Sequence, residues 1–156
     1  MDNMNYSFKY SVYSKVSDLE EIDSCLAKAA IEAARNSYAP YSHFNVGAVV
    51  RLANGIVIKG ANQENVAYPD GLCAERVAMY AAGGAYPDIP IESIAIAGGP
   101  DHSLTDDPVT PCGSCRQVMT EFRKRSGMPI SVILVGRKKV IKLRDVIDLL
   151  PFSFDI

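Results

Sequence analysis

The chain contains two short stretches that constrain both its architecture and its chemistry, Cys73-Ala74-Glu75 and Pro111-Cys112-Gly113-Ser114-Cys115. Together they supply three thiolates and one carboxylate. A catalytic zinc ion usually has three protein ligands and an open fourth position, whereas a structural zinc ion is held by four. The pattern therefore predicts a catalytic Zn²⁺ site with Cys73, Cys112 and Cys115 as ligands, and leaves Glu75 free for proton transfer.

Both stretches lie where helices are expected to begin. Residues 72–82 contain good helix formers and end at Gly83-Gly84, and residues 112–125 form a second helical segment. The N-terminus of a helix presents unpaired N–H groups and a partial positive charge, which lower the pKa of a nearby thiol. The two helices can therefore deliver ionised cysteines to one metal ion.

The segments around these helices have the patterns of strands. Residues 46–52 and 56–60 flank Ala53-Asn54-Gly55, and Asn-Gly between apolar runs is a strong signal for a hairpin. Three further apolar runs and a short helical segment complete the pattern, at residues 91–97, 130–135, 140–143 and 145–149. This order predicts an α/β protein, a three-layer α/β/α fold around a central mixed five-stranded sheet.

The N-terminal part is expected to form an arm and a helix. Residues 1–16 place apolar and aromatic side chains with a period near two, which predicts an extended arm or strand. Ser17 followed by Glu20 resembles a capping box, and apolar spacing predicts a helix that continues to about Asn36. We therefore divide the chain into an arm at 1–16 and one domain at 17–156. Cys25, beside the apolar stripe, is interpreted as a small buried residue and not a ligand.

Composition places the chain among ordinary globular proteins. Of its 156 residues, 48% are hydrophobic and 22% charged. No apolar run approaches the roughly 18 residues that span a bilayer, and the N-terminus lacks a secretory pattern, so we expect a cytoplasmic protein without a membrane partner. The net charge of −2 offers no general attraction to a phosphate backbone. The basic clusters at 123–125 and 137–139 are short, and no nucleic-acid partner is expected.

Four blocks of the sequence resemble those of the small cytidine deaminases in order and spacing. The resemblance covers roughly Leu19 to Phe154. The blocks are Tyr41-Ser42-His43-Phe44-Asn45-Val46-Gly47-Ala48, Asn62-Gln63-Glu64-Asn65, Cys73-Ala74-Glu75-Arg76 and Pro111-Cys112-Gly113-Ser114-Cys115-Arg116-Gln117. This resemblance implies zinc-dependent hydrolytic deamination of cytidine and 2′-deoxycytidine to uridine and 2′-deoxyuridine, with release of ammonia, in pyrimidine salvage. It also implies a homotetramer whose active sites are shared between subunits.

The same resemblance implies how a nucleoside is bound and converted. Glu75 would shuttle protons to the pyrimidine N3 and the leaving amine while hydroxide adds at C4. Ala74 would offer backbone hydrogen bonds to the pyrimidine, and Asn62 and Glu64 would bind the ribose. Two rings complete the implied site: Phe44, which packs on the nucleoside, and Phe154, which reaches into a neighbouring subunit.

Supporting roles follow for three more residues. Three thiolates leave the zinc centre with a net charge near −1, which arginine hydrogen bonds to sulfur can offset. The resemblance favours Arg76 for this role, whereas Arg116 could share it or form a surface ion pair. Gln117 is expected to support the site, and Tyr68 to lie at a subunit contact.

Other functions remain open at this level. A deaminase of a modified cytosine nucleoside, such as the antibiotic blasticidin S, would share the three-cysteine motif. A polynucleotide deaminase is disfavoured because the chain lacks a pronounced basic face. A non-catalytic structural zinc module would need a fourth ligand, Cys25 or one of the histidines, and would leave Glu75 without a role.

Overall fold

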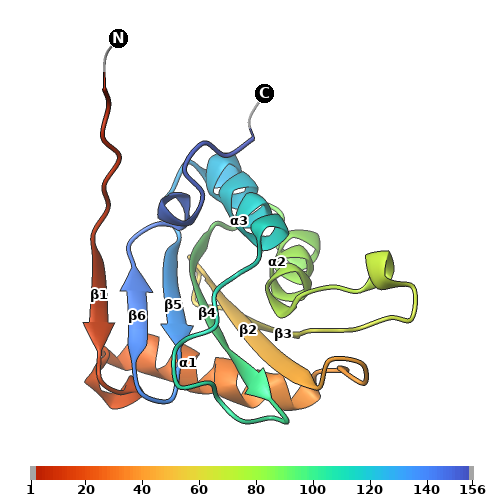
Figure 1. Ribbon diagram of the computed structural model, residues 1–156. Helices are drawn as coiled ribbons and strands as arrows, with labels where there is room; N and C mark the ends of the chain where they lie inside the picture. Colours follow the sequence, from red (N-terminus) through yellow and green to blue (C-terminus); the bar gives the residue numbers. More distant parts are fainter. Residues whose placement is uncertain (1–2, 155–156) are drawn as a thin grey trace.

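Helices cover both faces of one mixed β-sheet in residues 3–154, the part of the chain that the computed structural model describes (Figure 1). The strand order is β1-β6-β5-β4-β2-β3. β4 and β5 run parallel, and the remaining neighbours in the sheet are antiparallel. The strands are β1 (Tyr10–Tyr13), β2 (Phe44–Leu52), β3 (Val57–Ala61), β4 (Ile91–Pro100), β5 (Ser131–Val135) and β6 (Val140–Leu143).

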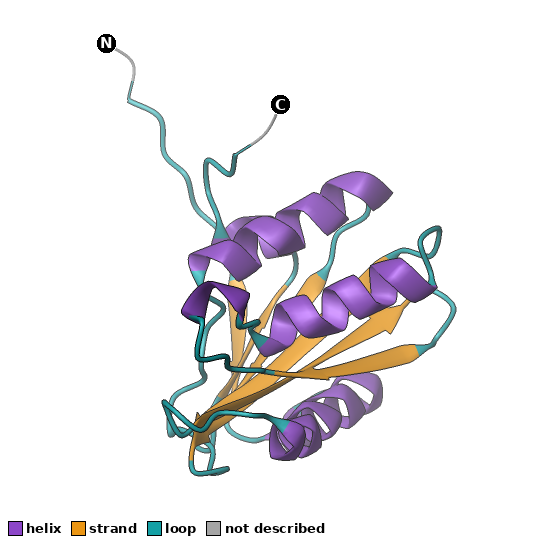
Figure 2. Cartoon of the chain, turned by 90° about the vertical axis from the view of Figure 1, so that its right-hand side faces the viewer, coloured by secondary structure: helices purple, strands orange, loops and turns teal. Residues whose placement is uncertain are grey.

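The helices form the outer layers and confirm the predicted three-layer α/β/α fold. α1 (Glu21–Ala33) packs on one face, and α2 (Ala74–Ala85) and α3 (Gly113–Ser126) pack on the other (Figure 2). Successive strand residues point to opposite faces, so each face has its own core. In β2, Val49 belongs to the α1 core, whereas Ala48 and Val50 belong to the core under α2 and α3.

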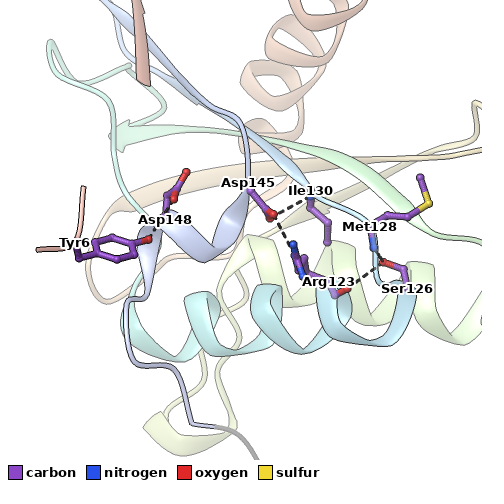
Figure 3. Close-up of polar contacts among 7 residues, drawn as sticks. All are labelled: Tyr6, Arg123, Ser126, Met128, Ile130, Asp145 and Asp148. Atoms are coloured by element: carbon purple, nitrogen blue, oxygen red, sulfur yellow. Dashed lines mark hydrogen bonds and ion pairs between the residues drawn. The ribbon is translucent and has the colours of Figure 1, made fainter. Parts of the chain in front are cut away.

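The sheet has six strands in the described residues, so the prediction of five is wrong. The additional strand is β1, which pairs antiparallel with β6 and places Tyr10 opposite Leu143 and Tyr13 opposite Val140. β6 would otherwise end the sheet with unpaired N–H and C=O groups. The alternating N-terminal run supplies a partner for that edge. Further along the arm, the Tyr6 hydroxyl donates to Asp148 Oδ1 at 3.2 Å (Figure 3).

The first helix differs from its prediction in two details. α1 begins at Glu21 without a side-chain cap, and Val16–Asp18 form a separate 3-10 turn, so the predicted capping box is wrong. Cys25 is exposed, contrary to its expected burial. Helical rotation of 100° per residue turns Cys25 out of the inward-facing stripe. The buried positions of the helix are Asp23, Ser24, Leu26, Ala27, Ala30 and Ala33.

The two basic clusters are engaged in contacts within the fold. Arg123 Nε lies 3.1 Å from Asp145 Oδ2, and the Arg125 guanidinium lies 4.8 Å from the centre of the Phe122 ring. The second cluster forms ion pairs with the loop that leads to Cys112: Arg137 and Lys138 pair with Asp106, and Lys139 with Asp107.

Main-chain contacts hold this loop, residues 101–111, as well. The amides of Arg137 and Lys138 donate to the carbonyls of Thr105 (2.8 Å) and Asp106 (3.1 Å). A Cβ on Gly136 would lie 2.7 Å from the nitrogen of Pro108, so the loop backbone rests directly on this turn. The β5–β6 turn therefore fixes the approach to α3. None of the helices in residues 3–154 has the length and apolar character needed to cross a membrane.

We expect Asp145→Ala to lower the free energy of unfolding by roughly 1–3 kcal/mol, the cost of leaving buried partners unsatisfied. Asp145 is 7% exposed and accepts hydrogen bonds from Arg123 Nε and from the Ile130 amide, at 3.1 and 3.3 Å (Figure 3). Asp148→Ala is the control, because its contact with Tyr6 is exposed. Urea titration measures both variants, and equal losses would contradict the role of Asp145.

Candidate metal and catalytic site

The starts of α2 and α3 bring three cysteine sulfurs together. Cys73 is the N-cap of α2, Cys112 is the N-cap of α3, and Cys115 lies in the first turn of α3. Their Sγ atoms all lie within 4.8 Å of one another, and Cys73 and Cys112 are 3.8 Å apart. Zn–S bonds of about 2.3 Å in a tetrahedral site place ligand sulfurs about 3.8 Å apart. The donor set and its spacing therefore fit a zinc ion.

The candidate fourth ligands named by the structural-module hypothesis lie outside this cluster. Cys25 is on α1, whose core is on the opposite face of the sheet. Neither histidine belongs to the group of close ligand atoms in the described residues. The arrangement is thus a three-sulfur site, which is typical of zinc that performs catalysis.

The three thiols do not ionise with equal ease. A hydrogen bond from Cys115 lowers the pKa of Cys73 to about 5, with further help from the Arg76 guanidinium. The same hydrogen bond raises the pKa of Cys115, because the bond is lost when its proton leaves. A bound cation would neutralise the repulsion between neighbouring thiolates and allow both residues to act as ligands.

Arg76, and not Arg116, is the arginine at the sulfurs. Arg76 Nη2 lies 4.0 Å from Cys73 Sγ, at the limit of a hydrogen bond to sulfur. Arg116 instead donates to two main-chain carbonyls, those of Pro111 (2.8 Å) and Leu149 (2.9 Å). These bonds connect the start of α3 to the C-terminal segment. Among the described residues, Arg116 forms neither a hydrogen bond to a cysteine sulfur nor a surface ion pair, the two interactions predicted for it.

Glu75 is buried in the first turn of α2, with 5% of its surface exposed. Burial raises the pKa of its carboxyl to about 7, and the negative charge of Cys73 adds to the shift. A carboxyl with a pKa near neutrality can both accept and release a proton under physiological conditions. The position and environment of Glu75 therefore suit a general acid and base.

A pocket of about 170 Å³ opens beside Cys73 and Cys112. It brings together four of the residues predicted to bind or convert the nucleoside: Phe44, Asn62, Ala74 and Glu75 line its wall. The wall also includes residues that the sequence analysis did not identify, namely Val46, Ile96, Val109 and Thr110. The last two directly precede Pro111-Cys112, and that adjacency was an available signal.

Asn62 and Glu64 are fixed by hydrogen bonds near the pocket. Asn62 Oδ1 accepts from the Val46 amide at 2.8 Å, and its Nδ2 donates to the Phe44 carbonyl at 2.9 Å. The Glu64 carboxylate accepts from the Ser42 hydroxyl and from the amides of Tyr41 and Ser42, and these bonds lower its pKa. Both residues also line an outer pocket of about 490 Å³, which shares Asn62 and Cys73 with the first.

Phe154 does not reach the cysteines of its own chain. The Gln117 side chain holds its backbone, donating from Nε2 to the Phe154 carbonyl (3.0 Å) and accepting from the Phe154 amide (3.2 Å). The Phe154 ring is 75% exposed, and Tyr68, beside the outer pocket, is 78% exposed. Gln117 thus orients the C-terminal segment, and within residues 3–154 it forms no hydrogen bond to the cysteine sulfurs.

Two cytidine deaminases are similar to this chain in sequence. The cytidine deaminase of Halalkalibacterium halodurans is 47% identical over 97 residues, covering 62% of this chain and 69% of the relative. The cytidine deaminase of Sporosarcina psychrophila is 38% identical over 134 residues, covering 86% and 91%.

Solved structures share the fold. The crystal structure of cytidine deaminase from Burkholderia pseudomallei superposes with a TM-score of 0.71 at 36% identity, covering 83% of this chain and 97% of that one. Cytidine deaminase from Mycobacterium tuberculosis gives 0.66 at 32% identity, covering 85% and 96%. The family model for the zinc-binding region of cytidine and deoxycytidylate deaminases matches residues 20–130, which include all three clustered cysteines. The chain therefore belongs to the cytidine and deoxycytidylate deaminase family.

Proposed function

We propose that this protein hydrolytically deaminates cytidine and 2′-deoxycytidine, releasing ammonia and forming uridine and 2′-deoxyuridine. The observation that carries the proposal is the buried Glu75 in the pocket that Cys73 and Cys112 also line. Water supplies the oxygen that replaces the amino group at C4, so substrate and water account for all the atoms of the products. Names of the relatives support the cytosine nucleoside as substrate.

Cys73, Cys112 and Cys115 would hold the zinc ion. When bound, such an ion acts as a Lewis acid that makes water nucleophilic near neutral pH. Three thiolates weaken this effect through their charge, and Arg76, 4.0 Å from the Cys73 sulfur, offsets part of it. The helix N-termini at Cys73 and Cys112 contribute in the same direction.

Glu75 would perform the proton transfers. Its carboxylate accepts a proton from the attacking water and donates one to N3 of the pyrimidine. A second transfer from water through Glu75 to the exocyclic nitrogen allows ammonia to leave. Burial, which raises the pKa of Glu75 to about 7, keeps its two protonation states close in free energy.

The wall of the pocket would orient the nucleoside. Phe44 would pack on the base, and the backbone of Ala74 would bind the pyrimidine. Asn62 and Glu64 would bind the ribose through the donors and lone pairs that their existing hydrogen bonds do not use. An amide offers two donors and two lone pairs, and a carboxylate about four lone-pair sites. Asn62 uses one donor and one lone pair, and Glu64 accepts three bonds. Each retains room for a hydroxyl group.

The outer pocket supports a second candidate substrate. Its volume of about 490 Å³ beside Asn62 and Cys73 could accommodate the larger substituents of a modified cytosine nucleoside such as blasticidin S. Loss of cytosine absorbance with purified, zinc-loaded protein tests cytidine, 2′-deoxycytidine and blasticidin S in parallel. Preferred turnover of blasticidin S would replace the first proposal, and no turnover of any of them would reject both.

We further propose a cytoplasmic homotetramer that serves pyrimidine salvage, with residues 1–16 as an N-terminal arm that contributes β1 to the sheet of the catalytic domain at 17–156. The exposed Phe154 ring supports shared active sites. Phe154→Ala should lower kcat/KM by about 2- to 13-fold, since an aromatic contact contributes about 0.5–1.5 kcal/mol. Phe152→Ala, which removes a ring that is 99% exposed, is the control.

Mixing the weakened Phe154→Ala variant with the inactive Glu75→Gln variant tests directly whether active sites are shared between subunits. Tetramers reassembled from Phe154→Ala and Glu75→Gln chains contain sites with an intact Glu75 facing an intact Phe154. Activity above that of either parent variant supports shared sites. Activity no greater than the average of the two would contradict them. Native mass spectrometry, which separates tetramers by the number of lighter Phe154→Ala chains that they contain, shows whether mixed tetramers formed.

A further inference from the structure

We infer that Gly60 is a positioning residue: it sets how closely α2 lies on the sheet, and thereby places Cys73 and Glu75 relative to α3. Gly60 is buried in β3, where it pairs with Ala48 of β2. The zinc-affinity part of this inference stands on geometry alone. The kinetic part rests on the proposed deaminase function.

The backbone of α2 approaches Gly60 more closely than a side chain would permit. A Cβ at this position would lie 2.6 Å from the Ala74 carbonyl oxygen, 2.6 Å from the Ala78 nitrogen and 3.0 Å from the Ala78 Cα. All three are backbone atoms, which cannot rotate away as a flexible side chain could. Ordinary contacts begin at 3.4 Å, so a methyl group here requires the helix to move by about 0.8 Å.

The part of α2 that would move is the part that carries the chemistry. Ala74 lies between Cys73, the N-cap, and Glu75, and all three share the first turn of the helix. Cys112 and Cys115 belong to α3, whereas the three atoms nearest to a Cβ at Gly60 all belong to α2. A displacement of α2 therefore changes the spacing of the Cys73 sulfur from the other two sulfurs. It also shifts Glu75 within the pocket.

Two other glycines provide matched controls. Gly84 lies near the end of α2, and a Cβ there meets nothing within 4 Å. Gly47 lies in β2 beside the Gly60 pair, but faces the other layer, where a Cβ would clash with the backbone of Ala30 and Ala34. Gly84→Ala thus tests an added methyl group alone, and Gly47→Ala tests strain that is directed at α1.

The experiment compares Gly60→Ala with these controls by zinc competition against a chromophoric chelator, steady-state kinetics and urea unfolding. For Gly60→Ala we expect zinc affinity to fall about 10–100-fold, the range found when the support of metal ligands is altered. We expect kcat to fall about 100-fold, as for a misplacement near 1 Å, with a smaller change in KM. Gly84→Ala should match the parent in zinc affinity and kcat, and should unfold at a slightly higher urea concentration because alanine favours a helix over glycine. Gly47→Ala should lose stability while keeping its zinc affinity.

Parent-like zinc affinity and kcat in Gly60→Ala would overturn the inference, even if the variant is less stable. If Gly60→Ala does not fold, Ala78→Ser decides, because it adds one oxygen atom to the fully buried side chain of the residue whose backbone nitrogen would lie 2.6 Å from a Gly60 Cβ. Weakened zinc binding by Ala78→Ser supports the inference, and unchanged binding rejects it. A parent protein that binds zinc but converts no cytosine nucleoside would refute the proposed function, while the affinity comparison would still test Gly60.

Discussion

Glu75→Gln is expected to reduce cytidine turnover by about 10²–10⁴-fold, the usual contribution of a general acid and base. The amide has nearly the same shape as the carboxyl group, so it fills the same buried space, but it cannot accept and return a proton. Zinc should remain bound, because the three sulfurs of the cluster do not include Glu75. Absorbance at the cytosine band and zinc content by atomic absorption provide the two measurements.

A matched control distinguishes the effect of removing any one carboxylate from the specific effect of removing the Glu75 carboxylate. Glu121 lies on the exposed side of α3, and Glu121→Gln should retain parent activity and zinc. Loss of zinc from Glu75→Gln would show that Glu75 is a ligand, and the catalytic assignment would then be wrong. Full activity in Glu75→Gln would exclude it as the proton carrier.

Cys115→Ser should abolish zinc binding and, with it, turnover. Cys115 is fully buried and hydrogen-bonds to Cys73, so its replacement removes one of three ligands and perturbs a second. The folded parent also gains stability from bound zinc, about 2.7 kcal/mol when free zinc exceeds Kd 100-fold. Cys115→Ser should forfeit that gain, and a chelator should lower the Tm of the parent but not that of the variant.

Cys25→Ala is the corresponding control, since this cysteine is exposed on the helix of the opposite layer. We expect one zinc ion per chain, parent turnover and a parent response to the chelator. Loss of zinc from Cys25→Ala would revive the structural-module hypothesis. Retention of zinc by Cys115→Ser would remove Cys115 from the ligand set.

Features governed by neighbouring residues could be predicted from the sequence. The Asn54-Gly55 turn was predictable because its requirement for positive φ is local, and Gly55 has a φ of 86°. The cysteines at the helix starts were predictable for a similar reason, since Cys112 and Cys115 are separated by less than one helical turn. The clustering of Cys73 with them was predictable because a catalytic zinc ion usually has three protein ligands.

Features that depend on distant partners could not be predicted in the same way. The alternation in residues 1–16 indicated extended backbone, but no local signal identified β6 as its partner. The exposure of Cys25 depends on which side of α1 meets the sheet, and the buried Asp23, paired with Lys142, lies on that side. Ile96 of the pocket wall is one apolar residue in an apolar strand, and only the packed fold distinguishes it from its neighbours.

The turn between β5 and β6 has a consequence for the rate at which ligands associate. It holds the loop 101–111 through the amides of Arg137 and Lys138 and through the close approach of Gly136 to Pro108. Val109 and Thr110 of that loop form one wall of the pocket, so this wall is in place before any ligand arrives. Binding at a preformed wall requires no slow closing step. Diffusion and desolvation, and not loop rearrangement, would then limit the encounter on this side of the site.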